Sequence, residues 1–198
     1  MDGSRIVEIA EIGVAVGTWV VALFTALLVK GHQSAANEQR KIQLSTAEEE
    51  RKIQLYLELR KEFDSQALVD ARVLFAEYLL DGKPHHEIIN QRILTFFEDL
   101  GMLVRRNYLD REMVWDTFGH FAKMWWSACR EYMARERSNF GGDRHFFGDF
   151  EFLVEQIYRD DVKKRNSTRT DLEPKPSDVE FFLLTEAQRP RGSSLKAA

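Results

Sequence analysis

The chain has 198 residues, a formal net charge of −4, and only 11 Gly, 4 Pro and one Cys. This length accommodates one ordinary domain with additional segments, and it excludes a large barrel or a multi-domain enzyme. A single Cys excludes a disulfide framework and any multi-Cys zinc or iron–sulfur site. Because the net charge is negative, the chain as a whole has no positive electrostatic field that would attract nucleic acid. The low Gly and Pro content argues against a turn-rich all-β fold.

The first feature along the chain is an uncharged apolar run at residues 12–29, IGVAVGTWVVALFTALLV. As a helix at about 1.5 Å per residue it would extend roughly 27 Å, close to the hydrocarbon thickness of a bilayer. The alternatives are a buried helix of a soluble protein and a signal peptide cleaved near Ser34. The run is longer than a usual signal-peptide core, and acidic residues precede it. We therefore expect a retained transmembrane helix with the lipid bilayer as its partner.

Basic residues lie mainly on one side of this run. Only Arg5 precedes it, whereas Lys30, Arg40 and Lys41 follow it. Because positive charge favours the cytoplasmic side of a membrane, residues 1–11 are expected outside and the long C-terminal part in the cytoplasm. The lone Cys129 agrees with a reducing compartment, where an unpaired thiol persists. The predicted location is a bacterial inner (plasma) membrane that the chain crosses once.

Small residues occur in pairs four positions apart inside the run, Gly13 with Gly17 and Ala22 with Ala26. Positions four apart share one helix face, so small side chains there let two transmembrane helices approach closely. Gly and Ala are also frequent in membrane helices without any such role. These four residues are our candidates for self-association into a homo-oligomer.

Residues 30–63 form the predicted helical connector, which contains no Gly or Pro from residue 32 onward. The motif RKIQL at residues 40–44 recurs at residues 51–55. A repeat of eleven residues corresponds to about 3.67 residues per turn, which places Ile42 and Ile53 on one helix face. The connector either pairs with its copy in a homo-oligomer or folds back onto the domain as a solvated helix.

Residues 64–160 carry the apolar spacing of amphipathic helices interrupted by Gly and Pro stops. Asp64 or Ser65 is placed to cap the first of these helices, and Asp110 is placed to cap the third. No segment shows strand-like alternation. The expected fold is therefore all-α, with a compact antiparallel four-helix bundle whose helices cover about residues 65–80, 87–107, 111–137 and 147–160.

Residues 161–198 differ in character from the bundle. They begin with a basic, polar stretch, and Pro174 and Pro176 discourage a continuous helix. An apolar island, VEFFLL at residues 179–184, either docks on another protein or lies back on its own bundle. We favour the second arrangement because a tether keeps the local concentration high. The rest of this tail is expected to be largely disordered.

Several short motifs resemble an uncharacterised bacterial family of membrane-anchored helical domains. The resemblance covers roughly residues 60–158, and it rests on ILTFFEDLG at 93–101, Leu109-Asp110, VWDTF at 114–118, Trp125-Trp126 and FEFL at 150–153. The resemblance implies an N-terminal anchor and a helical cytoplasmic domain. It implies no activity and no catalytic residues, because the matching positions are packing and capping residues.

The best candidate for chemistry is a ladder on the third helix. Glu112, Asp116 and His120 are spaced four apart, so they share one helix face and could bind a divalent metal, with Glu98 or Asp99 completing the shell. The alternative is a row of solvated acids that ends in a histidine. The Glu-x-x-His pairs of di-iron bundles do not occur here. We expect no cofactor and no enzymatic activity.

Two further residue groups have simpler explanations than chemistry. Cys129 lies among Trp and Tyr residues and is expected to be a buried, inert thiol. The basic group Lys163, Lys164, Arg165 and Arg169 could contact nucleic acid or anionic lipid, but it also reads as the basic end of a helix. We do not expect nucleic-acid binding.

These features favour a single-pass membrane protein whose helical domain binds or scaffolds a cytoplasmic protein of unknown identity. Two alternatives stay open at the level of sequence. One is a membrane-tethered, metal-dependent enzyme or effector that uses the ladder of Glu112, Asp116 and His120. The other is an envelope or lipid sensor that signals through the connector.

Overall fold

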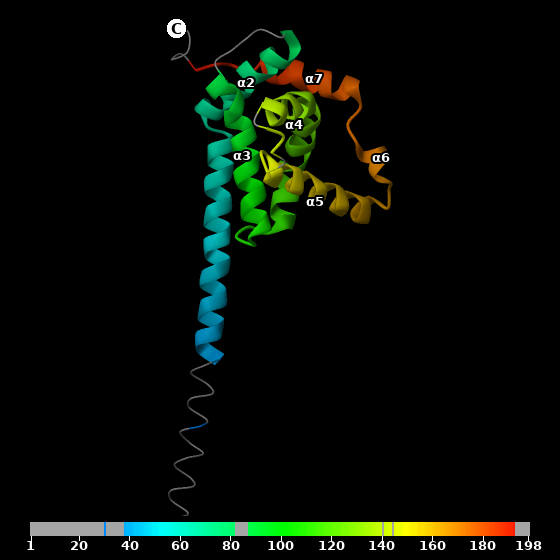
Figure 1. The fold of residues 1–198 in the computed structure, drawn as a ribbon. Helices are drawn as coiled ribbons and strands as arrows, with labels where there is room; N and C mark the ends of the chain where they lie inside the picture. The colour runs from blue at the N-terminus through cyan, green and yellow to red at the C-terminus, as the bar shows by residue number, and fades with distance from the viewer. Residues whose placement is uncertain (1–29, 31–37, 82–86, 140, 144, 193–198) are drawn as a thin grey trace, which may run out of the picture. The chain divides into compact units, whose positions relative to one another are not determined.

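A computed structural model of the chain describes residues 30, 38–81, 87–139, 141–143 and 145–192. Every regular element in these residues is a helix, which confirms the all-α prediction. Residues 38–63 are helical. The chain divides into two units, Met1–Arg51 and Lys52–Ala198. The labelled helices are α2 (Gln66–Asp81), α3 (Glu87–Arg105), α4 (Arg111–Asn139), α5 (Gly148–Arg165), α6 (Arg169–Leu172) and α7 (Pro176–Ala187) (Figure 1).

In the first unit, the helical residues 38–51 expose all of their side chains, including Ile42 and Leu44 of the repeated motif. The expected transmembrane helix at residues 12–29 lies outside the described residues, and so do its four small residues, Gly13, Gly17, Ala22 and Ala26. Among the residues that are described, no helix has both the length and the apolar composition needed to cross a bilayer.

In the second unit, residues 52–63 pack on the helical domain through one face. Leu59 and Phe63 are buried in its core, whereas Ile53 and Leu57 are exposed. The next helix, α2, begins after Ser65, whose Oγ accepts a hydrogen bond from the N–H of Leu68 at 3.3 Å. Ser65 is therefore the residue of the expected pair that caps this helix.

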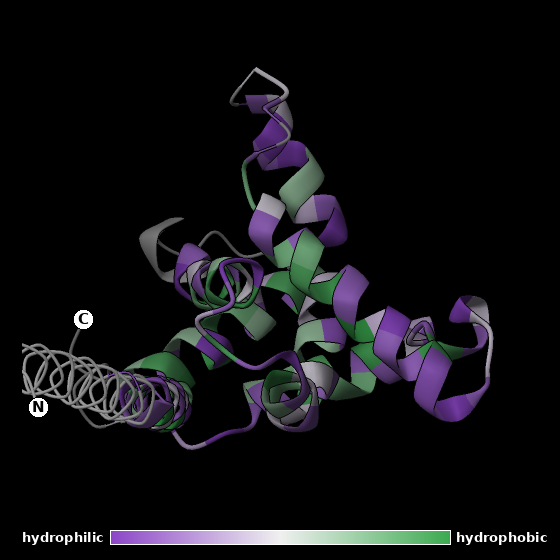
Figure 2. Ribbon diagram, turned by 90° about the horizontal axis from the view of Figure 1, so that it is seen from below, coloured by the Kyte–Doolittle hydropathy of each residue, from purple (hydrophilic) through white to green (hydrophobic). Residues whose placement is uncertain are grey.

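Aromatic side chains fill the core of this unit. Phe75 of α2 stacks on Trp125 of α4 at 5.8 Å between ring centroids, and Phe97 of α3 stacks on Phe150 of α5 at 4.9 Å. Figure 2 shows that hydrophobic residues gather where the helices meet, with hydrophilic residues on the outer sides. The core therefore joins α2 to α4 and α3 to α5 through rings, which bury large areas per side chain.

The helices do not form the simple antiparallel bundle that we expected. In Figure 1, α5 runs across α3 instead of alongside it. The crossing occurs at Gly101, where a Cβ atom would overlap the backbone carbonyl of Asp149. Because glycine has no side chain, the start of α5 approaches the α3 backbone at this point more closely than any residue with a Cβ atom would allow.

The expectation of a largely disordered tail is wrong for the part of it that is described. The fourth bundle helix continues to Arg165 and ends at Asn166, a left-handed residue with φ 48°. Beyond it, α6 and α7 follow, and α7 contacts both α2 and α4. The apolar island is the centre of α7, and Phe182 and Leu183 are buried. The tail therefore lies on its own domain, as we favoured.

Candidate binding groove

The three residues predicted on α4 as metal ligands have different neighbours. Glu112 forms an ion pair with Lys164 of α5 at 2.9 Å, and Asp116 is exposed. The ring of His120 lies edge-on to Phe182 of α7, with 6.3 Å between centroids. Among the described residues, no group of three or more His, Cys, Asp or Glu side chains is placed to hold a metal ion. The structure therefore does not bring this ladder together as one site.

The acids of α3 that were expected to complete the shell lie elsewhere. Glu98 Oε2 accepts a hydrogen bond from the N–H of Phe150 at 2.7 Å, at the start of α5. Burial raises the pKa of Glu98, although backbone hydrogen bonds from Phe150 and Asp149 oppose the shift. Burial also raises the pKa of Asp99. Glu98 therefore satisfies the N-terminus of α5 and fixes it on α3.

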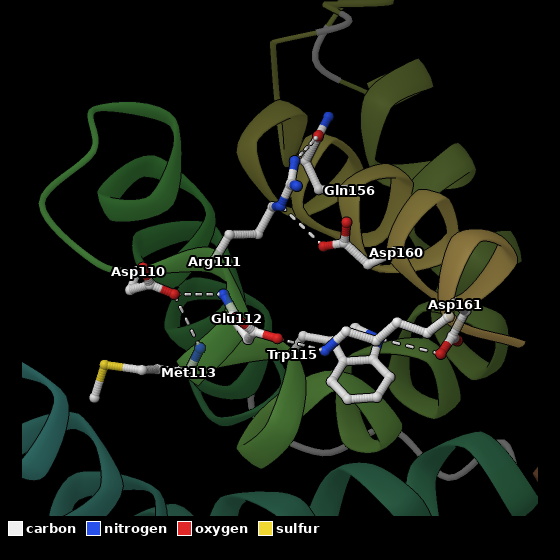
Figure 3. Close-up of polar contacts among 9 residues, drawn as sticks. Asp110, Arg111, Glu112, Met113, Trp115, Gln156, Asp160 and Asp161 are labelled. Atoms are coloured by element: carbon white, nitrogen blue, oxygen red, sulfur yellow. Dashed lines mark hydrogen bonds and ion pairs between the residues drawn. The ribbon is translucent and has the colours of Figure 1, made fainter.

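Charged side chains are concentrated between α4 and α5, where they form an internally paired cluster (Figure 3). Asp161 is 1% exposed, accepts a hydrogen bond from Trp115 Nε1 at 3.1 Å and forms an ion pair with Lys123. Arg111 pairs with Asp160 at 2.9 Å. We call these residues, together with Gln156, the α4–α5 polar cluster. Its members pair with one another, so the cluster joins the two helices.

A cavity of about 540 Å³ opens beside this cluster, between the end of α3, the start of α4 and α5. Its walls include Arg111 and Lys164, whose carboxylate partners Asp160 and Glu112 line the same cavity. Cations and anions are therefore matched around the opening. Such a wall gives little preference for a ligand of either charge.

The basic residues at the end of α5 also have partners within the domain. Arg165 lies 3.6 Å from Asp161, and Arg169 forms an ion pair with Glu155 at 2.7 Å. Hydrogen bonding to Glu155 raises the pKa of Arg169. These contacts agree with the interpretation of this group as the basic end of a helix.

The single thiol lies in the core. Cys129 is fully buried, and burial raises its pKa well above the ordinary value. The thiolate is the nucleophilic form of cysteine, so a raised pKa makes this side chain unreactive. The expected burial of Cys129 is confirmed.

The second unit holds α7 in a groove whose walls are α2 and α4, both of which α7 contacts. We call it the α2–α4 groove. The ring of Phe182 lies edge-on to Trp125 at 5.3 Å and to Phe121 at 6.4 Å between centroids. The outer side of α7 exposes Phe181 and Leu184. The inner face of α7 therefore packs against the domain, and its outer face exposes apolar side chains.

An ion pair lies at the α2 side of this groove. Arg72 of α2 and Glu186 of α7 are each 1% exposed, and Arg72 Nε lies 3.5 Å from Glu186 Oε2. Neither of these two atoms has a hydrogen-bond partner among the described residues. The Arg72 guanidinium also lies 4.2 Å from the centroid of the Phe63 ring, and Arg189 bonds Glu186 Oε1 at 2.9 Å. The charged pair is therefore buried but only partly satisfied.

The residues that follow α7 lie along α2. The N–H of Gly192 donates to Asp70 Oδ1 at 2.9 Å, and Gln66 Nε2 donates to the carbonyl of Pro190 at 3.3 Å. Arg191 forms an ion pair with Glu77. These polar contacts extend the attachment of α7 to its end.

The ion pair of the groove was not foreseen from the sequence. A signal was present on each helix. Arg72 lies four residues from both Leu68 and Ala76 and so interrupts the apolar face of α2, and Glu186 follows Phe182 by about one helical turn. A charge on an apolar helix face indicates a buried partner. The sequence does not reveal which acid supplies it, because the two residues are far apart along the chain.

Comparison with protein families gives one match, a sequence model that covers residues 12–157 and therefore most of the chain. The chain belongs to the DUF4760 family. This family is described as a domain of unknown function. Searches of curated proteins and of solved structures found no match. The resemblance to an uncharacterised family is thereby confirmed, and the matched region begins earlier than we expected.

Some of the features described above lie within the residues of the DUF4760 match, and others follow them. The uncharged run at residues 12–29 lies inside the match, and so do both walls of the α2–α4 groove. The occupant of that groove, α7, lies beyond residue 157. The family match therefore includes both walls of the groove and ends within α5, before the helix that fills the groove.

Proposed function

We propose that this DUF4760 protein is a single-pass membrane protein whose helical domain binds a cytoplasmic protein. One observation carries the proposal: the 18-residue run without charge begins where the family match begins. The match includes the run, which supports a retained segment of the domain over a leader peptide that is removed before the domain folds. The excess of basic residues after the run supports a cytoplasmic domain, in a bacterial inner membrane.

The surface of the second unit supports binding as the activity of the domain. Phe181, Leu184 and Tyr108 expose large apolar side chains, and Phe181 is 72% exposed. Exposed aromatic side chains are enriched at protein interfaces, where a few of them supply most of the affinity. The charged groups of the α4–α5 polar cluster, by contrast, are matched to one another.

Self-association belongs to the same proposal. The small residues Gly13 and Gly17 would let two membrane helices approach closely. In the described residues, Ile42 of the first unit is exposed, and so are Ile53 and Leu57 of the second. These side chains are available for contact with a second copy of the chain.

Membrane fractionation of the full chain tests the anchor. We expect the wild-type chain to sediment with membranes and to be released by detergent but not by salt. The double variant Val20→Lys, Leu23→Lys should move to the supernatant, because each lysine at the centre of a bilayer costs about 2.5–3.5 kcal/mol. The variant Val20→Leu, Leu23→Ile preserves the apolar character and is the matched control.

Two results would contradict the anchor. One is a wild-type chain of full length in the supernatant without detergent. The other is a mature chain that lacks its first residues, which an N-terminal tag lost from the membrane fraction would reveal. The second result would identify the run as a cleaved signal peptide.

A further inference from the structure

We infer that the α2–α4 groove is the site at which this domain receives a helix of its partner, and that α7 is an exchangeable occupant of the groove. The partner segment is an amphipathic helix with an aromatic residue followed, one turn later, by a carboxylate. The inference rests on the proposed binding function, for which it names the surface and the class of partner.

The groove offers two anchor points that match two side chains of its occupant. The rings of Trp125 and Phe121 on α4 lie edge-on to the Phe182 ring, and the Arg72 guanidinium of α2 lies beside the Glu186 carboxylate. Phe182 and Glu186 are four residues apart, so they lie on one face of α7. A helix that lays an apolar face with spaced anchors into a groove is a common mode of peptide recognition.

The occupant satisfies the charged anchor incompletely. Arg72 Nε and Glu186 Oε2 lie 3.5 Å apart, and neither has a hydrogen bond among the described residues. Arg–carboxylate pairs with good geometry reach about 2.7–2.9 Å and often form two parallel hydrogen bonds. A buried pair without such bonds does not recover the full cost of removing both charges from water. A partner carboxylate that reached Arg72 with better geometry would therefore replace Glu186 favourably.

The attachment of α7 allows exchange. Both walls of the groove lie within the residues that the DUF4760 match covers, whereas α7 follows those residues. The connection between α5 and α7 contains the four-residue helix α6 and Pro174, and Figure 1 shows it at the edge of the unit. Short tethers give effective concentrations of about 1 mM. A competing helix must therefore bind tightly or be held near the groove, as a partner in the same membrane would be.

A labelled peptide of residues 169–192, added to the detergent-solubilised full chain, tests the exchange by fluorescence anisotropy. Phe182→Ala in the chain weakens the internal occupant and leaves the groove walls unchanged. We expect the peptide to bind this variant at least about tenfold more tightly than the wild-type chain. Phe181→Ala is the matched control, since that side chain is exposed, and it should leave peptide affinity at the wild-type value.

Variants on both partners show whether the two anchors carry the binding. Arg72→Met in the Phe182→Ala chain should lower peptide affinity by about tenfold, and a peptide with Phe182→Ala should lose binding. Hydrogen exchange of α3 and α4 reports whether each chain is folded. If Phe182→Ala unfolds the domain, Glu186→Gln, which preserves side-chain size, takes its place as the weakened chain.

Equal peptide affinity for the wild-type and weakened chains would overturn the inference, as would no binding to a folded, weakened chain. A wild-type chain that exchanges α7 between two copies, detected by cross-linking α2 of one copy to α7 of the other, would show that the occupant is a second copy and overturn the proposed partner helix. Neither result bears on membrane fractionation. Failure of the groove and failure of the anchor are therefore distinguishable.

Discussion

Single residues decide where the helices of the second unit meet, and Gly101 is the clearest case. A Cβ atom at this position would overlap the carbonyl of Asp149, so Gly101→Ala forces the backbones of α3 and α5 apart. We expect the variant to lose about 2–3 kcal/mol of unfolding free energy, measured by denaturant titration of the detergent-solubilised chain. Gly148→Ala is the control, because nothing lies within 4 Å of a Cβ there, and its midpoint should stay near the wild-type value.

Glu98 lies at the same contact between α3 and α5, and it makes the stability of the folded chain depend on pH. Burial raises its pKa in the folded chain above the ordinary value of 4.5, so the folded state holds a proton that the unfolded state has released. Its contribution to stability is therefore present at low pH and is lost as pH rises through the folded pKa. Glu98→Gln retains an acceptor for the Phe150 N–H and does not titrate. We expect the stability of this variant relative to wild type to increase as the pH rises above the ordinary pKa of 4.5, and a constant difference would contradict the assignment.

At the scale of elements, we expect two ion pairs between α4 and α5 to contribute very differently to the free energy of unfolding. Asp161 is buried with Lys123, whereas Glu112 pairs with Lys164 at the surface. Asp161→Asn leaves Lys123 nearly buried without its counter-charge and should cost about 3 kcal/mol of unfolding free energy. Adding Lys123→Met should recover part of that loss. Glu112→Gln is the surface control, and we expect no measurable change in its denaturation midpoint.

The sequence predicts α2 to α5 well because their stops and caps are local. Ser65 caps α2, and Asp110 Oδ1 accepts the N–H of Glu112 at 2.7 Å at the start of α4, as expected. The crossing of α3 and α5 was not predictable, because Gly101 reads as a poor helix former until its neighbour in space is known. The ladder of Glu112, Asp116 and His120 was foreseen as one face, but the contacts that separate its members come from other helices.

The tail shows how one residue can give opposite signals. Pro174 and Pro176 indicate a break in the helix, and the chain does divide here into α5, α6 and α7; Pro176 is also the first residue of α7. Proline is compatible with that position, since the first N–H groups of a helix have no partner within it and the fixed φ suits the helix. The burial of Phe182 then stabilises α7 from outside, through groove residues that are distant in the sequence.

At the scale of the whole molecule, the proposed topology places the two ends of the chain on opposite sides of a membrane. The natural thiol does not interfere with a test, because Cys129 is buried and its pKa is raised well above the ordinary value. Ser4→Cys lies before the uncharged run, and Ser138→Cys lies at an exposed position near the end of α4. Thiol labelling at these two positions therefore reports the orientation of the chain.

We expect a membrane-impermeant maleimide to label Ser4→Cys in intact spheroplasts and to label Ser138→Cys only after the membrane is permeabilised. The wild-type chain should remain unlabelled in both conditions, which shows that each signal comes from the introduced thiol. The reverse pattern would mean that the basic residues after the run do not set the orientation. Labelling of both positions in intact spheroplasts would place the domain outside, where a partner helix for the α2–α4 groove would have to come from the envelope.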